Sequence, residues 1–291
     1  MPHRKTDPAP ASLPQRFKVA ENVDIVADVG GPDSGLPVIL LHGGGQTRHS
    51  WKYLAQKLIR SGCRVTNVDL RGHGDSDWDP KGDYSLDTMV KDLQILIAHQ
   101  PKPPVIVGAS LGGIMALLTI GESDRPIASG IALVDIVPKV EKAGSDAIVH
   151  FMTANPDGFA TLEDAAAAVA AYLPHRPRPP SNKGLMKNLR PRDDGRLYWH
   201  WDPRLVTSDM KQQRPAEMAA RLEQAAKNLR IPTLLVRGAK SDLVSMEGVK
   251  HFLELIPDAS FVDVKGAAHM VAGDMNDVFS QAIIDFMKQR L

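Results

Sequence analysis

The chain is poor in cysteine, in aromatic side chains and in net charge. Its 291 residues include one cysteine, Cys63, so no intramolecular disulfide can form. Lys and Arg total 35 against 34 Asp and Glu, and this balance gives no sign of a nucleic-acid groove or an anionic membrane surface. No apolar run reaches the length that crosses a membrane. These absences favour a globular protein whose substrate is not strongly charged.

Other absences concern metals and targeting. There is no HExxH motif and no paired cysteine spacing, so we expect neither a metal site nor a dissociable cofactor. Residues 1–16 are polar and proline-rich and lack the apolar stretch of a signal peptide, which predicts a flexible arm and a cytoplasmic location. Cys63 has no histidine pattern around it and is expected to be buried and unreactive.

Short apolar runs alternate with segments of helical spacing along most of the chain. Pro37–Leu41 is wholly apolar, as is typical of a strand buried on both faces of a parallel sheet. Further strands are expected at 17–20, 24–29, 64–68, 104–107, 127–134, 233–236 and 260–264, and helices at 51–60, 86–99, 111–121, 249–255 and 277–290. The alternation predicts an α/β fold with a doubly wound, mostly parallel, eight-stranded sheet.

The alternation stops between Pro138 and Leu229. This stretch contains an alanine-rich helical segment, 164–172, a proline-rich segment and no convincing strand. We therefore predict a core formed by residues 17–137 and 230–291, interrupted by a helical cap over residues 138–229.

The most informative motif is Gly108-Ala109-Ser110-Leu111-Gly112, which lies between a predicted strand and a predicted helix. G-x-S-x-G in this context is a nucleophile elbow, a turn so tight that its backbone is strained. The turn lifts the serine hydroxyl clear of the sheet, and the helix N-terminus faces a developing anion. Ser110 is the predicted nucleophile.

A serine nucleophile needs a base, and the base needs a carboxylate that holds its tautomer. His269 follows the last predicted strand, and loops at the carboxyl ends of parallel strands converge on one edge of the sheet. Asp242 follows the preceding strand and gives the chain order Ser, Asp, His. We predict Ser110, His269 and Asp242 as the catalytic triad, with Asp135, which ends the strand after the elbow, as the alternative acid.

Acyl transfer also needs two N–H donors for the oxyanion. One is expected from Leu111, directly after the nucleophile. The other is expected from the glycine run after Pro37–Leu41, with Gly44 as first choice and Gly43 and Gly45 as alternatives. His42, which precedes the run, is interpreted as a brace for this loop rather than as a second base.

Together these motifs resemble the α/β-hydrolase superfamily, which includes epoxide hydrolases, haloalkane dehalogenases, C–C hydrolases, perhydrolases and carboxylesterases. The matching stretches are His42–Gly45, Asp69–Ser76, the elbow, Arg237–Asp242 and Gly266–His269. The resemblance implies the α/β-hydrolase fold, a helical cap at 138–229 and a structural role for the Asp69–Ser76 turn, including His73.

The residue at the elbow separates the chemistries of this superfamily. Its epoxide hydrolases and dehalogenases use aspartate there, whereas this chain has Ser110. We therefore predict a serine hydrolase of small apolar carboxylic esters that needs no cofactor, no nucleic acid and no membrane. Perhydrolase, lactonase or C–C hydrolase activity would use the same residues, and a non-catalytic small-ligand receptor is the alternative of another class. The sequence is compatible with a homodimer but does not define the oligomeric state.

The predicted cap contains an aromatic cluster, Tyr198-Trp199-His200-Trp201. Trp199 and Trp201 are predicted to line the substrate pocket, and burial in the core of the cap is an equally weighted alternative. Trp51, near the glycine run, is expected to belong to the core.

Overall fold

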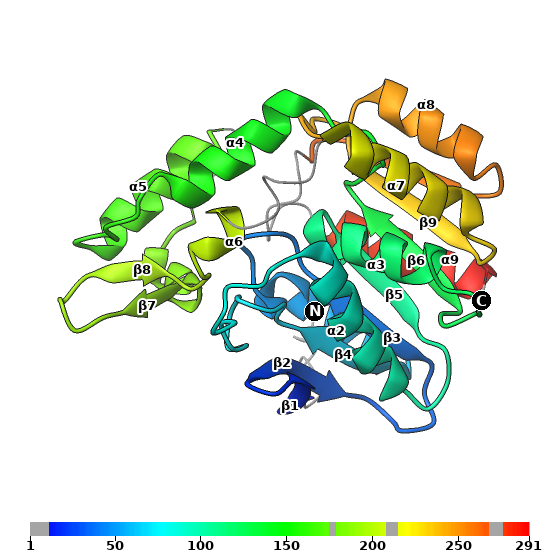
Figure 1. Cartoon of the computed structure of the whole chain (residues 1–291), viewed down its shortest axis with the longest axis horizontal. Coiled ribbons are helices and arrows are strands. Elements are labelled where there is room, and N and C mark those ends of the chain that lie inside the picture. Colours follow the sequence, from blue (N-terminus) through cyan, green and yellow to red (C-terminus); the bar gives the residue numbers. More distant parts are fainter. Residues whose placement is uncertain (1–11, 175–178, 208–214, 268–275, 291) are drawn as a thin grey trace, which may run out of the picture.

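A mixed eight-stranded sheet forms the centre of the molecule (Figure 1). The computed structural model describes residues 12–174, 179–207, 215–267 and 276–290. The strands lie in the order β1-β2-β4-β3-β5-β6-β9-β10. Their bounds are β1 Ser12–Ala20, β2 Val23–Gly30, β3 Pro37–Leu41, β4 Arg64–Val68, β5 Val105–Ala109, β6 Gly130–Val134, β9 Thr233–Gly238 and β10 Ser260–Val264. Within this sheet the pairs β1–β2 and β2–β4 are antiparallel, and the other strand pairs are parallel. The predicted fold class is confirmed.

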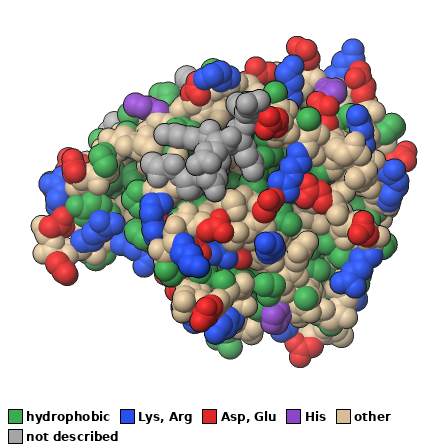
Figure 2. Space-filling model, viewed as in Figure 1, with side chains coloured by type: hydrophobic (Ala, Val, Ile, Leu, Met, Phe, Trp, Pro, Cys, Tyr) green, Lys and Arg blue, Asp and Glu red, His purple; other side chains and the backbone are tan. Residues whose placement is uncertain are grey.

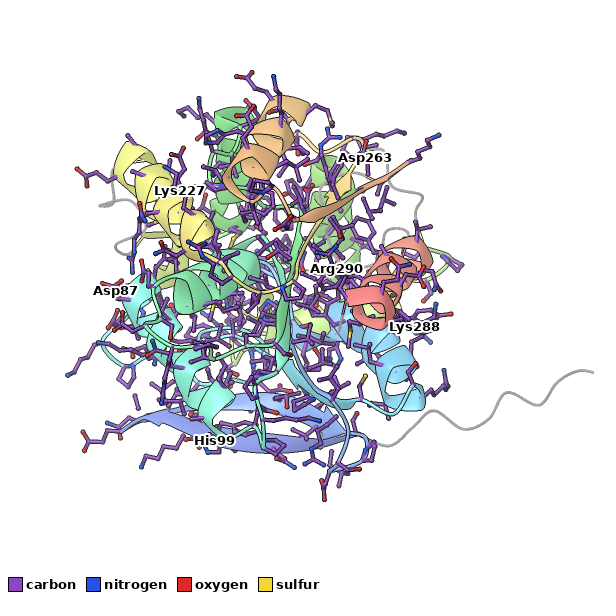
Figure 3. All side chains as sticks on the ribbon, turned by 90° about the vertical axis from the view of Figure 1, so that its right-hand side faces the viewer. Asp87, His99, Lys227, Asp263, Lys288 and Arg290 are labelled. Atoms are coloured by element: carbon purple, nitrogen blue, oxygen red, sulfur yellow. The ribbon has the colours of Figure 1, made fainter. Side chains whose placement is uncertain are left out.

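Helices cover both faces of the sheet (Figure 3). One face packs against α2 Leu86–Ala98, α3 Leu111–Gly121, α7 Pro215–Asn228 and α8 Met246–Leu255, and the other against α1 Lys52–Arg60 and α9 Asn276–Arg290. A short 3-10 helix, η1 Arg48–Trp51, precedes α1. The strands between these layers are apolar because both of their faces are buried. Trp51 and Cys63 are buried in the layer beneath α1 and α9, as expected.

The parallel strands bring several loops to one edge of the sheet. Leu41 of β3 is in register with Gly108 of β5, and Ala109 of β5 with Val134 of β6. Val134 is in turn in register with Val236 of β9. The segments that follow β3, β5, β6 and β9 therefore begin side by side, and this edge is where a site can be assembled.

The segment between β6 and β9 differs from the expected all-helical cap. It contains α4 Lys142–Thr153, α5 Leu162–Tyr172, η2 Asn182–Asn188 and α6 Arg204–Thr207, but also a hairpin of β7 Leu189–Pro191 and β8 Leu197–Trp199. The two strands are three residues long and pair only with each other, so they left no clear alternation in the sequence. Together, α4, α5 and the hairpin project beyond the sheet (Figure 1).

The last helix of the predicted cap range belongs to the core layer. α7 packs against α3 so closely that a Cβ on Gly121 would lie 2.3 Å from the carbonyl oxygen of Ala225. The boundary at residue 229 is therefore too late, because helix spacing alone does not reveal which surface a helix covers.

The predicted arm at residues 1–16 also ends earlier than expected. β1 begins at Ser12 and pairs with β2 from that residue onward. Its first five residues are all exposed, Leu13 among them, and they lack the alternation of apolar and polar residues that is typical of a half-buried strand. Arg16 ties the strand down through ion pairs with Asp24 and Asp77.

The outer surface mixes both signs of charge. Lys and Arg are interspersed with Asp and Glu over the face in Figure 2, with no large field of one sign. Within the described part of the chain, no helix combines the length and apolar character needed to cross a bilayer.

Candidate active site

Ser110 occupies a strained turn between β5 and α3. Its backbone has φ 45° and ψ −115°, a conformation that non-glycine residues rarely adopt. The turn is held from both sides, since the Ser110 N–H donates to the Val134 carbonyl at 3.1 Å and the Ser110 carbonyl accepts from the Ile114 N–H at 2.9 Å. Ser110 thereby stands at the edge of the sheet, at the N-terminus of α3, as the elbow motif predicts.

The glycines of the elbow are required by close contacts. A Cβ on Gly108 would lie 2.4 Å from the Gly112 carbonyl oxygen. A Cβ on Gly112 would lie 2.6 Å from the Leu41 carbonyl oxygen, and one on Gly113 would lie 2.5 Å from Ile136. The backbones of the turn, of β3 and of the helix thus approach one another within a distance that only glycine permits.

The glycine run after β3 lies directly against Ser110. A Cβ on Gly43 would lie 3.3 Å from the Ser110 Cβ. The Gly43 N–H is already bonded to the Gln46 side-chain oxygen at 3.3 Å, and the Gly45 N–H to His73 Nε2 at 3.1 Å. Gly44 is therefore the one glycine of this run whose N–H has no acceptor among the described residues.

Leu111 supplies the second available donor. It is the first residue of α3, and the first N–H groups of a helix have no carbonyl acceptor within the helix. The Leu111 side chain reaches within 4.0 Å of the Cβ position of Gly44, so the two segments are neighbours. Two N–H groups beside a serine are the arrangement that an oxyanion needs.

Buried histidines brace this loop. His42 accepts the Leu70 N–H at Nε2, 3.0 Å, so the ring carries its proton on Nδ1, which donates to the Gly43 carbonyl at 2.8 Å. His73 accepts the Gly45 N–H and donates from Nδ1 to the Arg71 carbonyl at 3.0 Å. Burial lowers the pKa of His42 to about 4 and that of His73 to about 3. Both rings are neutral acceptors, as the structural interpretation of His42 and of the 69–76 turn expects.

A third histidine joins the segment between β6 and β9 to the core. His200, directly after β8, accepts the Gly74 N–H at Nδ1, 2.8 Å. Its ring lies 6.0 Å from that of His73, and burial, followed by His73, lowers its pKa well below the usual value. Sequence reasoning placed His200 in an aromatic cluster but missed this role, because its partner lies 126 residues away.

Asp135 lies at the edge of the sheet beside the elbow. It directly follows β6, is fully buried and has φ 51°, which makes it the other non-glycine residue with positive φ in the described part of the chain. Its carboxylate accepts the Ser241 hydroxyl at 2.7 Å and the Gly238 N–H at 3.3 Å. A buried carboxylate held in a strained backbone at this edge has the character of a functional group.

Asp242 has a different environment. Its side chain is exposed, and its charge is felt by Tyr172, whose pKa is raised to about 12 by burial and then by Asp242. His269 lies outside the described residues. Ala267, two residues earlier, accepts the Lys240 N–H at 2.8 Å, so the loop after β10 starts beside the loop after β9.

Residues of α4 and α5 form one wall of a cavity in front of Ser110. The cavity is lined by Ser110, Gly43–Gln46, Ile148, Phe151, Met152 and Tyr172. The last four come from α4 and α5, so these two helices contribute the apolar side of the cavity. Phe151 and Tyr172 stack at 4.3 Å between ring centroids.

Trp199 and Trp201 lie one layer behind this wall. Their rings stack with centroids 4.8 Å apart, and the two residues are 7% and 3% exposed. Neither residue lines the cavity formed by the described residues. Trp199 packs against Phe151 at 5.4 Å, and the Trp201 ring approaches the Cβ position of Gly45 to 3.5 Å. This geometry favours the core-of-the-cap alternative for both residues.

Comparison with known sequences relates the chain to hydrolases, including esterases. The profile of the alpha/beta hydrolase family matches residues 38–282. Protein phosphatase methylesterase 1 of Bos taurus is 30% identical over 177 residues, which cover 56% of this chain and 47% of that protein. The match therefore spans about half the length of that relative. Esterase Rv0045c of Mycobacterium tuberculosis is 30% identical over 218 residues, covering 72% of this chain and 67% of that protein.

Solved structures of hydrolases share the fold over most of the chain. The crystal structure of E-2-(acetamidomethylene)succinate hydrolase superposes with a TM-score of 0.82 at 23% identity, over 96% of this chain and 100% of that one, a likeness of fold alone. A structure of the M. tuberculosis esterase Rv0045c has a TM-score of 0.75 at 25% identity, over 98% of this chain and 94% of that one. Since the family profile covers most of the chain and the sheet has the order described above, the chain belongs to the alpha/beta hydrolase family.

Proposed function

We propose that this protein hydrolyses carboxylic esters through an acyl-enzyme formed on Ser110. One observation carries the proposal: a serine in a strained elbow lies beside two backbone N–H groups, of Gly44 and Leu111, that have no other acceptor among the described residues. The esterases among the relatives support the same class of reaction.

The steps follow from ordinary acyl-transfer chemistry. The Ser110 hydroxyl attacks the ester carbonyl while His269 takes its proton, and the Gly44 and Leu111 N–H groups stabilise the oxyanion. Collapse of the tetrahedral intermediate breaks the bond to the alcohol, which leaves with the proton from His269. Water then attacks the acyl-enzyme with His269 as base, which releases the carboxylic acid and restores Ser110. No step requires a cofactor.

Burial supports Asp135 rather than Asp242 as the acid of the triad. A carboxylate that orients an imidazole acts best where water is excluded and its own rotation is fixed. Asp135 has both properties, whereas Asp242 is exposed. We therefore propose Ser110, His269 and Asp135, and keep Asp242, the first choice from the sequence, as the alternative that mutagenesis must exclude.

The cap supports a preference for a small apolar substrate. Ile148, Phe151 and Met152 face the cavity with hydrocarbon, thioether or aromatic groups, and Tyr172 is the cap residue there that carries a hydroxyl. Apolar walls of this kind select acyl chains by size rather than by charge. We propose that α4, α5 and the β7–β8 hairpin together form the cap over the active site.

A panel of p-nitrophenyl esters of rising chain length tests the proposal, together with labelling by a fluorophosphonate. We expect turnover of the short esters, covalent labelling at Ser110, and loss of both in Ser110→Ala, because removing a triad member typically leaves only about 10³–10⁴-fold catalysis over water. Near-wild-type turnover in Ser110→Ala would refute the mechanism. A chain that neither labels nor turns over esters would instead indicate a receptor.

A further inference from the structure

The Ser241 hydroxyl occupies a central position in the loop after β9. It donates to Asp135 Oδ2 at 2.7 Å. Its oxygen also accepts the N–H of Leu243 at 3.2 Å and that of Val244 at 3.1 Å. A serine hydroxyl has one hydrogen and two acceptor sites, so these three bonds use its full capacity. The hydroxyl hydrogen can only point at Asp135.

The other carboxylate oxygen is held by the same loop. The Gly238 N–H donates to Asp135 Oδ1 at 3.3 Å. The backbone of Asp135 is fixed as well, because its N–H donates to the Val236 carbonyl at 2.7 Å. Both oxygens of a fully buried carboxylate are thus contacted by the β9 segment, although Asp135 itself ends β6.

We propose that Ser241 is a positioning residue: its hydroxyl fixes the rotation of the Asp135 carboxylate, and thereby the direction in which the negative charge faces the catalytic imidazole. The inference rests on the proposed function with Asp135 as the acid. Ser241 does not touch the reacting atoms and acts through Asp135 alone.

The consequence for catalysis is a change in rate and not in binding. Without the hydroxyl, the carboxylate loses the 2.7 Å hydrogen bond to Oδ2, and its rotation is less constrained. A hydrogen bond to a charged group of this kind is worth roughly tenfold to a hundredfold in an equilibrium. We therefore expect Ser241→Ala to lower kcat by about that factor, with KM changed by less than about twofold because the residue does not line the cavity in front of Ser110.

Two companion variants separate positioning from loop stability. Ser241→Thr keeps the hydroxyl and should restore kcat to within a few-fold of the wild type. Ser245→Ala is the matched control: Ser245 lies four residues later and caps α8 through the Gly248 N–H at 3.2 Å. It should lower the melting temperature and leave kcat unchanged.

A double-mutant cycle provides the decisive measurement. If Ser241 acts through Asp135, Ser241→Ala should lower kcat strongly in the wild type and by less than about twofold in an Asp135→Asn background. The rate of fluorophosphonate labelling should follow the same pattern. Equal losses in both backgrounds, a kcat in Ser241→Ala within twofold of the wild type, or failure of Ser241→Thr to restore kcat would each overturn the inference.

The failure of the proposed function would look different. If Ser110→Ala kept full activity, the mechanism itself would be wrong. If Ser110→Ala were inactive while Asp135→Asn retained full activity, the esterase proposal would survive, and the positioning role of Ser241 would be refuted.

Discussion

The buried histidines predict how the fold responds to acid. Burial lowers the pKa of His42 from 6.5 to about 4, so the folded state binds fewer protons than the unfolded state between these pH values. The contribution of neutral His42 to the free energy of unfolding is therefore fully present above about pH 6.5 and is lost as the pH falls toward 4. A shift of this size corresponds to about 3 kcal/mol for His42 alone. His73 and His200 shift in the same direction and add to the loss.

Urea denaturation followed by tryptophan fluorescence measures this loss. Between pH 6 and 5 we expect the free energy of unfolding to fall by about 2–4 kcal/mol, because each histidine contributes up to about 1.4 kcal/mol per pH unit. The buried Asp92, whose pKa is raised chiefly by burial, opposes this trend at lower pH.

One variant tests the assignment to the histidines. His73→Gln provides an amide oxygen that can accept the Gly45 N–H, but this side chain does not titrate. The substitution should therefore reduce the dependence of the unfolding free energy on pH by about one proton. A fall of less than about 0.5 kcal/mol between pH 6 and 5 in the wild type would refute the reasoning.

Three further predictions concern the site and its supports. Asp135→Asn should lower kcat by about 10⁴-fold and Asp242→Asn by less than tenfold; steady-state kinetics decides, and the reverse order would restore Asp242 as the acid. Gly112→Ala should lower the melting temperature sharply because its Cβ would lie 2.6 Å from a carbonyl oxygen, whereas Gly184→Ala, in open space, should not; equal melting temperatures would contradict the steric argument. Trp199→Ala should reduce stability by about 3–5 kcal/mol with an unchanged ester-length profile, while Met152→Ala should change that profile; a shifted profile in Trp199→Ala would return the tryptophan to the pocket.

The elbow could be predicted from the sequence because its requirements are steric and local. Gly108 and Gly112 lie within two residues of Ser110, and the contacts that demand glycine arise wherever a strand turns sharply into a helix. The glycine run after β3 is predicted to supply an oxyanion donor on the same local grounds, and the Gly44 N–H, unlike those of Gly43 and Gly45, has no acceptor among the described residues. Local steric requirements are therefore sufficient to predict these positions from the sequence.

The choice between Asp135 and Asp242 as the acid of the proposed triad depends on burial, which this local reasoning does not supply. Asp135 is distinguished by its burial and by a hydroxyl 106 positions along the chain, and neither feature leaves a trace near residue 135 in the sequence. Adjacency of loops favoured Asp242, but adjacency does not distinguish an exposed side chain from a buried one. The hairpin and the core position of α7 were missed for a related reason, since both depend on which surface a segment covers.

The strain at Ser110 has a consequence for how this protein could change over many generations. A serine at φ 45° opposes folding by about 1–3 kcal/mol, a burden that glycine at the same position would not carry. Ser110→Gly should therefore melt at a higher temperature than the wild type while losing its chemistry. Under the proposed function, a descendant that only binds its ligand would arise by a substitution that also raises stability, so Ser110 persists only where selection for turnover maintains it.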